Sequence, residues 1–297
     1  MWKKELSVMI LVALGSVACG EEDGGGADPN SAGKGTATFT TWGEEYIEEG
    51  IPAGGEGGFV DGWSVKFSKF LVVLGHVTVA DGSGKEAAKM TGSRLVDHVK
   101  KGKKSLVSFP DLPAGAYEKV SYEILPADAQ TELLGVDAAD KDFMIENNYS
   151  VYVEGTATKE QSNKTFKWGF SQRTRYIECK AEQDGKETLG IVITSGGTDT
   201  SELTIHGDHF FYDRLQADPT GQIPTNLRFE ALARADEEGD KNGEVTLDEL
   251  TKAPIDLIAG YDPSGFSVTN MREFVTELTR TLGHFRGEGE CTIVRAQ

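Results

Sequence analysis

The chain has 297 residues, of which 38% are hydrophobic and 9% aromatic. That is enough apolar material for a folded core, and it excludes a disordered protein. The 30 Lys and Arg residues against 48 Asp and Glu residues give a formal net charge of −18. A surface of this sign repels nucleic-acid phosphates and anionic lipid headgroups, so the charge argues against nucleic-acid binding and suits cation binding.

The first 19 residues have the pattern of an export signal. Lys3 and Lys4 precede a short apolar run over residues 6–18, which is shorter than the ~20 residues that span a bilayer as a helix. Residues 15–19 (GSVAC) resemble the lipobox of bacterial lipoproteins. The resemblance implies cleavage before Cys19, lipidation of Cys19 and a membrane partner through that lipid. An ordinary secretory signal is the alternative, because Ser16 stands where the family usually has Leu.

The remaining chain divides by composition. Residues 1–18 form the signal, and the Gly-rich, acidic residues 19–34 are predicted to be a flexible tether. Residues 35–223 are predicted to be a β-sandwich domain, and residues 224–297 a helical segment packed on it. In a bacterium with two membranes, Gly20 after the cysteine resembles the signal for the outer membrane.

Short apolar and alternating runs without helices between them predict the β-sandwich, with antiparallel strands. The predicted strands are residues 36–42, 63–67, 70–79, 105–109, 117–124, 149–157, 165–170, 174–179, 189–194 and 202–205. The segment 65–73 (VKFSKFLVV) and the later turn 112–117 (LPAGAY) resemble uncharacterised exported bacterial β-sandwich families. The resemblance implies a fold and no activity.

Two histidines follow the last predicted strand. His206 and His209, with Asp208 between them, offer ligands of the kind that zinc and copper prefer. His284 and His76 are the candidates for a third ligand. The alternative is structural, because histidines at strand ends commonly hydrogen-bond a neighbouring loop. Phe210, Phe211 and Tyr212 next to them are predicted to be core.

The apolar period changes to that of helices from about residue 224. The predicted helices are residues 226–235, 246–252 and 270–282. The last has an apolar stripe that is predicted to pack onto the sandwich, made of Met271, Phe274, Val275, Leu278 and Leu282.

Residues 238–249 (EGDKNGEVTLDE) resemble the calcium loop of the EF-hand, aligned on the sharp-turn glycine Gly243. The resemblance assigns calcium ligands to Glu238, Asp240, Asn242, Glu244, Thr246 and Glu249. The first position is usually Asp, and Asp236 is close enough to replace Glu238. The alignment places Phe266–Val268 as a possible short strand against Val245, within a second loop at residues 261–272 that lacks calcium ligands.

Once Cys19 is assigned to lipid, Cys179 and Cys291 remain as an even pair. In an oxidising compartment such a pair predicts a disulfide between the β region and the C-terminus.

No nucleophile elbow, zincin motif, phosphate loop or dinucleotide fingerprint occurs in the sequence. The sequence therefore favours a non-enzymatic, membrane-anchored, calcium-binding lipoprotein of the cell envelope, with a protein or glycan partner left open. One alternative is a transition-metal protein or metalloenzyme using His206 and His209. Another is a carbohydrate-binding sandwich, which requires exposed Trp42, Trp63 and Trp168.

Overall fold

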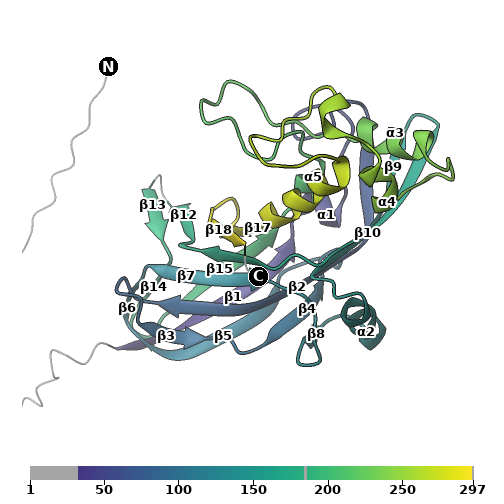
Figure 1. Cartoon of the computed structure of the whole chain (residues 1–297). Coiled ribbons are helices and arrows are strands. Elements are labelled where there is room, and N and C mark those ends of the chain that lie inside the picture. The colour runs from purple at the N-terminus through teal and green to yellow at the C-terminus, as the bar shows by residue number, and fades with distance from the viewer. Residues whose placement is uncertain (1–32, 184–185, 296–297) are drawn as a thin grey trace, which may run out of the picture. The chain divides into compact units, whose positions relative to one another are not determined.

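The computed structural model describes residues 33–183 and 186–295 (Figure 1). These residues form one compact unit. The lipobox, Cys19 and nearly all of the predicted tether lie outside the described residues. The described part is mainly β with a few short helices, as the sequence predicts.

The smaller of the two main sheets has four strands in the order β17-β15-β1-β5. Along β1, buried residues alternate with exposed or half-exposed ones, which is the period of a strand with one face on a core. β1 pairs with β5 antiparallel but with β15 in parallel, from Thr36 opposite Thr198 to Gly43 opposite Ile205. The strands are β1 (Lys34–Gly43), β5 (Lys104–Pro113), β15 (Thr198–Ile205) and β17 (Gly283–Phe285).

The larger sheet runs in the order β16-β10-β9-β2-β7-β11-β18, with β3 and β4 also on β2, and β8 on β4. Its longest strand, β2, joins two predicted strands, because a register shift between Phe67 and Lys69 absorbs the break in alternation. The strands are β2 (Ser64–Ala80), β3 (Glu86–Lys89), β4 (Ser93–Asp97), β7 (Lys119–Ile124), β8 (Glu132–Leu134), β9 (Val151–Lys159), β10 (Ser162–Phe170), β11 (Thr174–Ile177), β16 (Glu244–Val245) and β18 (Thr292–Arg295).

Two further strand pairs complete the β structure. The first joins β6 (Gly115–Tyr117) to β14 (Ile191–Ile193), and the second joins β12 (Lys180–Gln183) to β13 (Lys186–Leu189).

The main core draws its side chains from both sheets and from the helical segment. Aromatic rings fill much of it: Phe166 lies 4.6 Å from Trp168 and 6.1 Å from Phe211, measured between ring centroids. A smaller cluster around Leu71 and Met144 packs helix α2 (Ala138–Glu146) against the large sheet. The core therefore confirms the prediction that Phe210 and Phe211 are buried.

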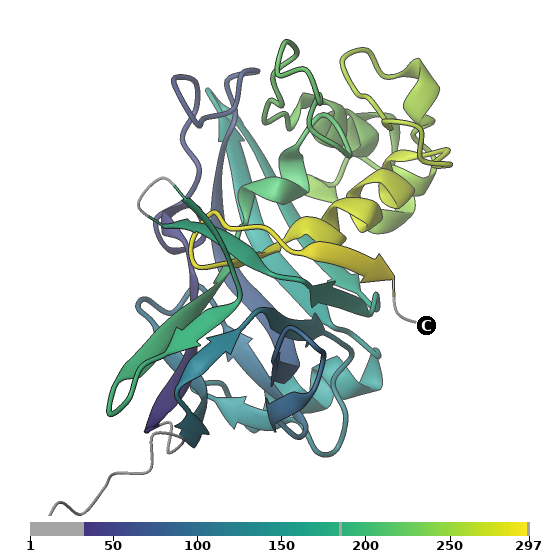
Figure 2. The same ribbon diagram turned by 90° about the vertical axis from the view of Figure 1, so that its left-hand side faces the viewer.

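The other helices gather at one end of the sheets (Figures 1 and 2). The α-helices are α1 (Glu45–Glu48), α3 (Glu230–Glu238), α4 (Leu247–Thr251) and α5 (Met271–Leu278), and the 3-10 helices are η1 (Asp208–Phe211), η2 (Ile255–Leu257) and η3 (Thr279–Thr281). The apolar stripe of α5 is buried along its whole length, as its period predicts.

The structure differs from the sequence prediction around Val245. Phe266–Val268 lies in no strand, and β16 pairs in parallel with β10 instead, at Thr165 and Phe166. The indole Nε1 of Trp168 also donates to the Val245 carbonyl at 2.8 Å. The apolar residue of the loop is therefore anchored on the large sheet rather than on a second loop.

The disulfide between Cys179 and Cys291 is present, as predicted, and spans 112 residues of sequence. It joins the segment after β11 to the residue before β18. The C-terminal segment is thus tied covalently to the large sheet.

Candidate metal centre

Three imidazoles meet where the small sheet approaches the helical segment. His206 follows the last residue of β15, His209 lies in η1, and His284 lies in β17. The ring centroids of His206 and His284 are 4.3 Å apart, those of His209 and His284 5.1 Å, and those of His206 and His209 5.4 Å. The antiparallel register of β15 and β17, with Thr204 opposite His284, holds two of these rings side by side.

Carboxylates surround the imidazoles. Ligand atoms of His206, Asp208 and His209 all lie within 4.8 Å of one another, and so do those of His206, His284 and Glu288. A further carboxylate, Oε2 of Glu44, lies 3.7 Å from Nδ1 of His206. These are nitrogen and oxygen donors at the mutual distances found around one bound metal ion.

Glu44 reaches this site because β1 and β15 run in parallel. The last paired residues of the two strands are Gly43 and Ile205, so the next residues, Glu44 and His206, leave the sheet together. The Glu44 amide also donates to the Ile205 carbonyl at 3.3 Å. Glu44 carries no signal in the sequence that would link it to His206, because nothing in a strand pattern indicates which remote strand lies beside it.

Several buried polar atoms at this site have no hydrogen-bond partner among the described residues. They are Glu44 Oε1, His206 Nε2, Asp208 Oδ1 and His284 Nδ1. An unpartnered buried donor or acceptor costs about 1–3 kcal/mol. Such atoms are rare in native structures, and four within one cluster of residues indicate a group that should bind them.

Hydrogen bonds behind the cluster fix which atoms face it. The Thr281 hydroxyl donates to the Leu278 carbonyl at 2.9 Å, so it accepts from Nδ1 of His209, 2.8 Å away. That assignment leaves the Nε2 lone pair of His209 free to bind a metal. In the same way, the Tyr212 hydroxyl donates to Oδ2 of Asp208 at 2.9 Å and leaves Oδ1 free.

Burial favours the neutral form of two of the imidazoles, His206 and His209. Desolvation, followed by the neighbouring His284, lowers the pKa of His206 to about 4. The same two causes, in the same order, lower the pKa of His209 well below its usual value. Neutral imidazole is the form that binds metals, so these two side chains need no deprotonation at neutral pH.

The pKa values of the two carboxyls beside the imidazoles, Glu44 and Asp208, shift in the opposite direction. Burial, and then the neighbouring Asp208, raise the pKa of Glu44, and burial raises the pKa of Asp208. Without a cation, the pair therefore holds a proton more strongly than free carboxyls do. A bound metal ion would displace that proton and remove the repulsion between the two groups.

Two glycines allow the close packing around the ligands. A Cβ on Gly207 would lie 2.6 Å from Cγ1 of Ile47, and a Cβ on Gly283 would lie 2.6 Å from the hydroxyl oxygen of Tyr122. Both distances are too short for real contacts, so only glycine fits without a shift. Each glycine adjoins ligand candidates in sequence, and each therefore helps to set their positions.

The predicted calcium loop also brings carboxylates together. Oxygen atoms of Asp236, Asp240 and Glu249 lie within 4.8 Å of one another. Glu238, at the first position of the EF-hand alignment, is exposed at the end of α3 and belongs to no such group among the described residues. Asp236 therefore takes its place.

The calcium-loop carboxylates already have protein partners. The Lys164 ammonium donates to Oδ2 of Asp236 at 2.5 Å, and the Gly243 amide donates to Oδ1 at 3.1 Å. Burial raises the pKa of Asp236, but these two groups outweigh it, and the pKa lies below the usual value. Glu249 accepts from the Thr246 amide at 2.9 Å and caps α4.

The other oxygen ligands of the EF-hand alignment turn toward the loop backbone. Asn242 Oδ1 accepts from the Glu244 amide at 2.7 Å, and Asn242 Nδ2 donates to Asp240 at 2.9 Å. The loop thus differs from the histidine cluster, since hydrogen bonds account for its polar atoms.

Other candidates from the sequence lie elsewhere. His76 is within 3.2 Å of Glu123, on the large sheet. Trp63 and Trp168 are buried, which removes the condition that the carbohydrate-binding alternative requires. Of the three tryptophans in that alternative, Trp42 alone is half-exposed, with Nε1 donating to Glu202 at 2.7 Å.

Comparison with protein-family models finds no match for this chain, and comparison with curated proteins finds none either. Among solved structures, MbnP from Methylosinus trichosporium is a distant neighbour with a TM-score of 0.29 and 11% sequence identity. The similarity covers 60% of this chain and 76% of that chain. A similarity this low carries no argument about function, so the site is interpreted from its own residues. Within the described part, no helix is long and apolar enough to cross a membrane.

Proposed function

We propose that this protein is an exported metal-binding protein whose principal site is the histidine cluster of His206, His209 and His284, with Asp208, Glu44 and Glu288 around it. The observation that carries the proposal is the close approach of ligand atoms in two overlapping groups, His206 with Asp208 and His209, and His206 with His284 and Glu288, each within 4.8 Å. Buried polar atoms of the same residues have no hydrogen-bond partner among the described residues. A cation removes the cost of those atoms, and three imidazoles with carboxylates favour zinc or copper over calcium or magnesium.

The site would hold its metal with the free Nε2 of His209 and with donor atoms of His206, His284 and Asp208. Neutral imidazoles bind without losing a proton, whereas the buried Glu44 and Asp208 pair releases one. Binding should therefore release protons and become weaker as the pH falls.

Metal analysis of protein purified without chelators or an affinity tag tests the proposal. We expect about one zinc or copper per chain, or a saturable uptake of one equivalent by the apo protein. His209→Ala and His284→Ala should abolish it, and His76→Ala, which changes a histidine of the large sheet, should leave it intact. Absence of high-affinity zinc and copper uptake by the wild type would refute the proposal.

A calcium site in the loop from Asp236 to Glu249 is the second candidate. It is supported by the convergence of three carboxylates and by the match to the EF-hand pattern from Asp240 onward. The ion would have to compete with the Lys164 ammonium for Asp236, so we expect weak affinity and a structural role. Calcium would then clip α3 and α4 to the large sheet through β16 and β10.

Calorimetry of the apo protein with calcium separates this second site from the first. Asp240→Asn should remove the heat of binding, and Glu238→Gln, which changes an exposed carboxylate outside the cluster, should not. No heat and no change in melting temperature at millimolar calcium would exclude the site. Neither result depends on the histidine cluster.

We propose that lipid on Cys19 anchors the exported protein to a bacterial membrane, and to the outer membrane where there are two. The lipobox resemblance supports the anchor, and the disulfide supports an oxidising compartment. Labelling of cells with a radioactive fatty acid should mark the wild type and not Cys19→Ser. Unlabelled wild-type protein released into the medium would contradict the anchor.

A further inference from the structure

A cavity of about 780 Å³ adjoins the histidine cluster, and both His209 and His284 line it. Its size falls within the range of pockets that hold small organic molecules. The remaining walls come from the segment after η1, from α5 and η3, and from the C-terminal segment that includes Cys291. Three arginines also line it, although the chain as a whole is strongly acidic: Arg214, Arg280 and Arg295.

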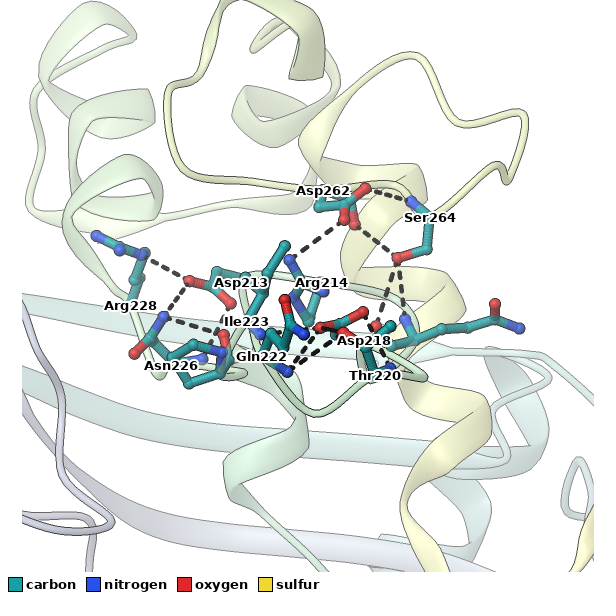
Figure 3. A network of polar contacts seen from close by, with 12 residues as sticks. Asp213, Arg214, Asp218, Thr220, Gln222, Ile223, Asn226, Arg228, Asp262 and Ser264 are labelled. Atoms are coloured by element: carbon teal, nitrogen blue, oxygen red, sulfur yellow. Dashed lines mark hydrogen bonds and ion pairs between the residues drawn. The ribbon is translucent and has the colours of Figure 1, made fainter.

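Arg214 is nearly buried and poorly paired. Its side chain is 10% exposed, and its ion pair within the described residues is with Asp262, at 3.3 Å from Nη2 to Oδ2 (Figure 3). Asp262 is shared, because its Oδ1 accepts from the Ser264 amide at 2.7 Å. A guanidinium has five N–H donors, so most of those on Arg214 remain available for a ligand.

Arg280 is the second guanidinium with spare donors. Its side chain is 16% exposed, and its buried Nε has no hydrogen-bond partner among the described residues. The nearest carboxylate, Glu277, lies 3.5 Å from that nitrogen and is also bound by Arg295 at 2.6 Å. One carboxylate therefore serves two guanidinium groups. Nη1 of Arg280 donates to the Arg173 carbonyl at 3.2 Å and to the Thr174 hydroxyl at 3.3 Å, so Nε and Nη2 are the donors left for a ligand.

The wall that carries Arg214 is held in place by hydrogen bonds. Asp213 accepts from the Asn226 amide at 3.0 Å and from Nε of Arg228 at 2.9 Å, which closes the loop between them (Figure 3). Within this loop, Asp218 accepts from the amide of Ile223 at 2.9 Å. A wall that is ordered in advance loses less entropy when a ligand binds.

The rest of the lining limits what the ligand can be. Leu215, Leu278, Phe266 and Ile293 offer apolar surface, which suits an apolar body. The carboxylates Glu277, Glu288 and Glu290 also line the cavity and would repel a doubly charged group such as a phosphate. A singly charged, planar carboxylate meets less repulsion and matches the fork of an arginine.

From these contacts we infer that the cavity is a binding site for an organic monocarboxylate with an apolar body, whose carboxylate pairs with Arg214 and Arg280. The inference goes beyond the proposed metal site and does not require a metal, since neither arginine belongs to the histidine cluster. The apolar part would lie along Leu278 and Ile293.

Calorimetric titration of the chelator-treated full chain with decanoate, decylamine, decanol and decyl phosphate tests the inference. We expect saturable binding of decanoate at one site. The alcohol should bind at least tenfold more weakly because it lacks the hydrogen-bonded charge, and so should the amine because its positive charge is repelled by the arginines. No saturable decanoate binding at millimolar concentration, or equal binding of decanol, would overturn the inference. Tighter binding of decyl phosphate would overturn the carboxylate assignment.

Variants locate the site. Arg214→Gln and Arg280→Gln should each weaken decanoate binding about tenfold or more, and Arg94→Gln, on β4 and away from the cavity lining, should not. Because loss of Arg214 could disturb the fold, Ile293→Trp provides a second test. It keeps all three arginines, enlarges a side chain of the cavity lining on the exposed strand β18, and should also reduce binding. Unchanged affinity in Arg214→Gln or in Ile293→Trp would place the ligand elsewhere and overturn the inference. Metal uptake, measured separately, tests the proposed function without reference to this result.

Discussion

Removal of the Cys179–Cys291 disulfide should destabilise the fold and weaken the metal site together. The bond closes a segment of 112 residues. For a loop of that length the chain-entropy relation gives about 5 kcal/mol of stabilisation relative to the reduced unfolded chain. In a domain of this size, 1 kcal/mol corresponds to ~2–4 °C in melting temperature. We therefore expect the variant Cys179→Ala with Cys291→Ala to melt ~10–20 °C below the wild type.

The same bond should affect metal binding, because it anchors the segment that carries His284 and Glu288. The Phe285 amide donates to the Gly289 carbonyl at 2.8 Å, and Cys291 lies two residues further on. Once the bond is lost, non-covalent contacts hold the segment. Among them are the pairing of β18 with β11, with Thr174 opposite Arg295 at one end of the register, and the bond from the Lys180 amide to the Glu290 carbonyl at 2.8 Å. The ordering of the ligand segment then costs entropy, and affinity for zinc or copper should fall.

Melting followed by circular dichroism, with and without a thiol reductant, measures the first effect, and competition with a chelating dye measures the second. Reductant should lower the melting temperature of the wild type to that of the double variant and should leave the double variant unchanged. A double variant that melts within about 2 °C of the wild type would refute the entropy argument. Unchanged metal affinity in a clearly destabilised variant would refute the coupling.

Three further predictions follow from buried groups. Burial lowers the pKa of His98 to about 3, below its unfolded value of about 6.5, so unfolding takes up a proton between these pH values. The stability that neutral His98 contributes is present above pH 6.5 and is lost as the pH falls toward 3, by up to about 5 kcal/mol. Urea unfolding between pH 7 and pH 4 measures how the free energy of unfolding changes with pH. The slope of that change should be smaller by about one proton in His98→Asn, and an unchanged slope would contradict this. Gly207→Ala should lower the free energy of unfolding by about 1–3 kcal/mol and impair metal uptake, because the new Cβ would lie 2.6 Å from Ile47. Normal metal uptake and a wild-type melting temperature in this variant would contradict the prediction. Zinc at one hundred times its dissociation constant should raise the melting temperature by ~5–10 °C in the wild type and not in His284→Ala, and equal shifts in both would remove His284 from the site.

Local patterns in the sequence determined the secondary structure. Alternation of apolar and polar residues is a property of one strand, so β1 and β9 could be recognised without knowledge of their neighbours. The stripe of α5 was equally local, since its buried face is set by a period of 3.6 residues. The disulfide followed from the parity of the cysteines, because only two remain once Cys19 is assigned to lipid.

The tertiary structure decided the composition of the candidate site. His206, Asp208 and His209 are close in sequence and could be grouped by spacing, but Glu44 lies far away along the chain. If β1 and β15 had paired antiparallel, the end of β1 would lie opposite the start of β15. The two strands pair in parallel instead, and this brings Glu44 beside His206. Strand direction within a sheet depends on long-range packing and not on the local pattern.

The predicted calcium loop illustrates the same division. Spacing identified Asp240, Asn242 and Glu249, because the positions of ligands within one loop are fixed by its backbone. Spacing could not reveal that Lys164, from β10, would reach Asp236, since that contact depends on the parallel pairing of β16 with β10. The residue types in the sequence thus determined which metal ligands and charged groups are available. The packing of distant strands decided which of these groups meet and which atoms remain free, because only the folded chain brings remote donors and acceptors within bonding distance.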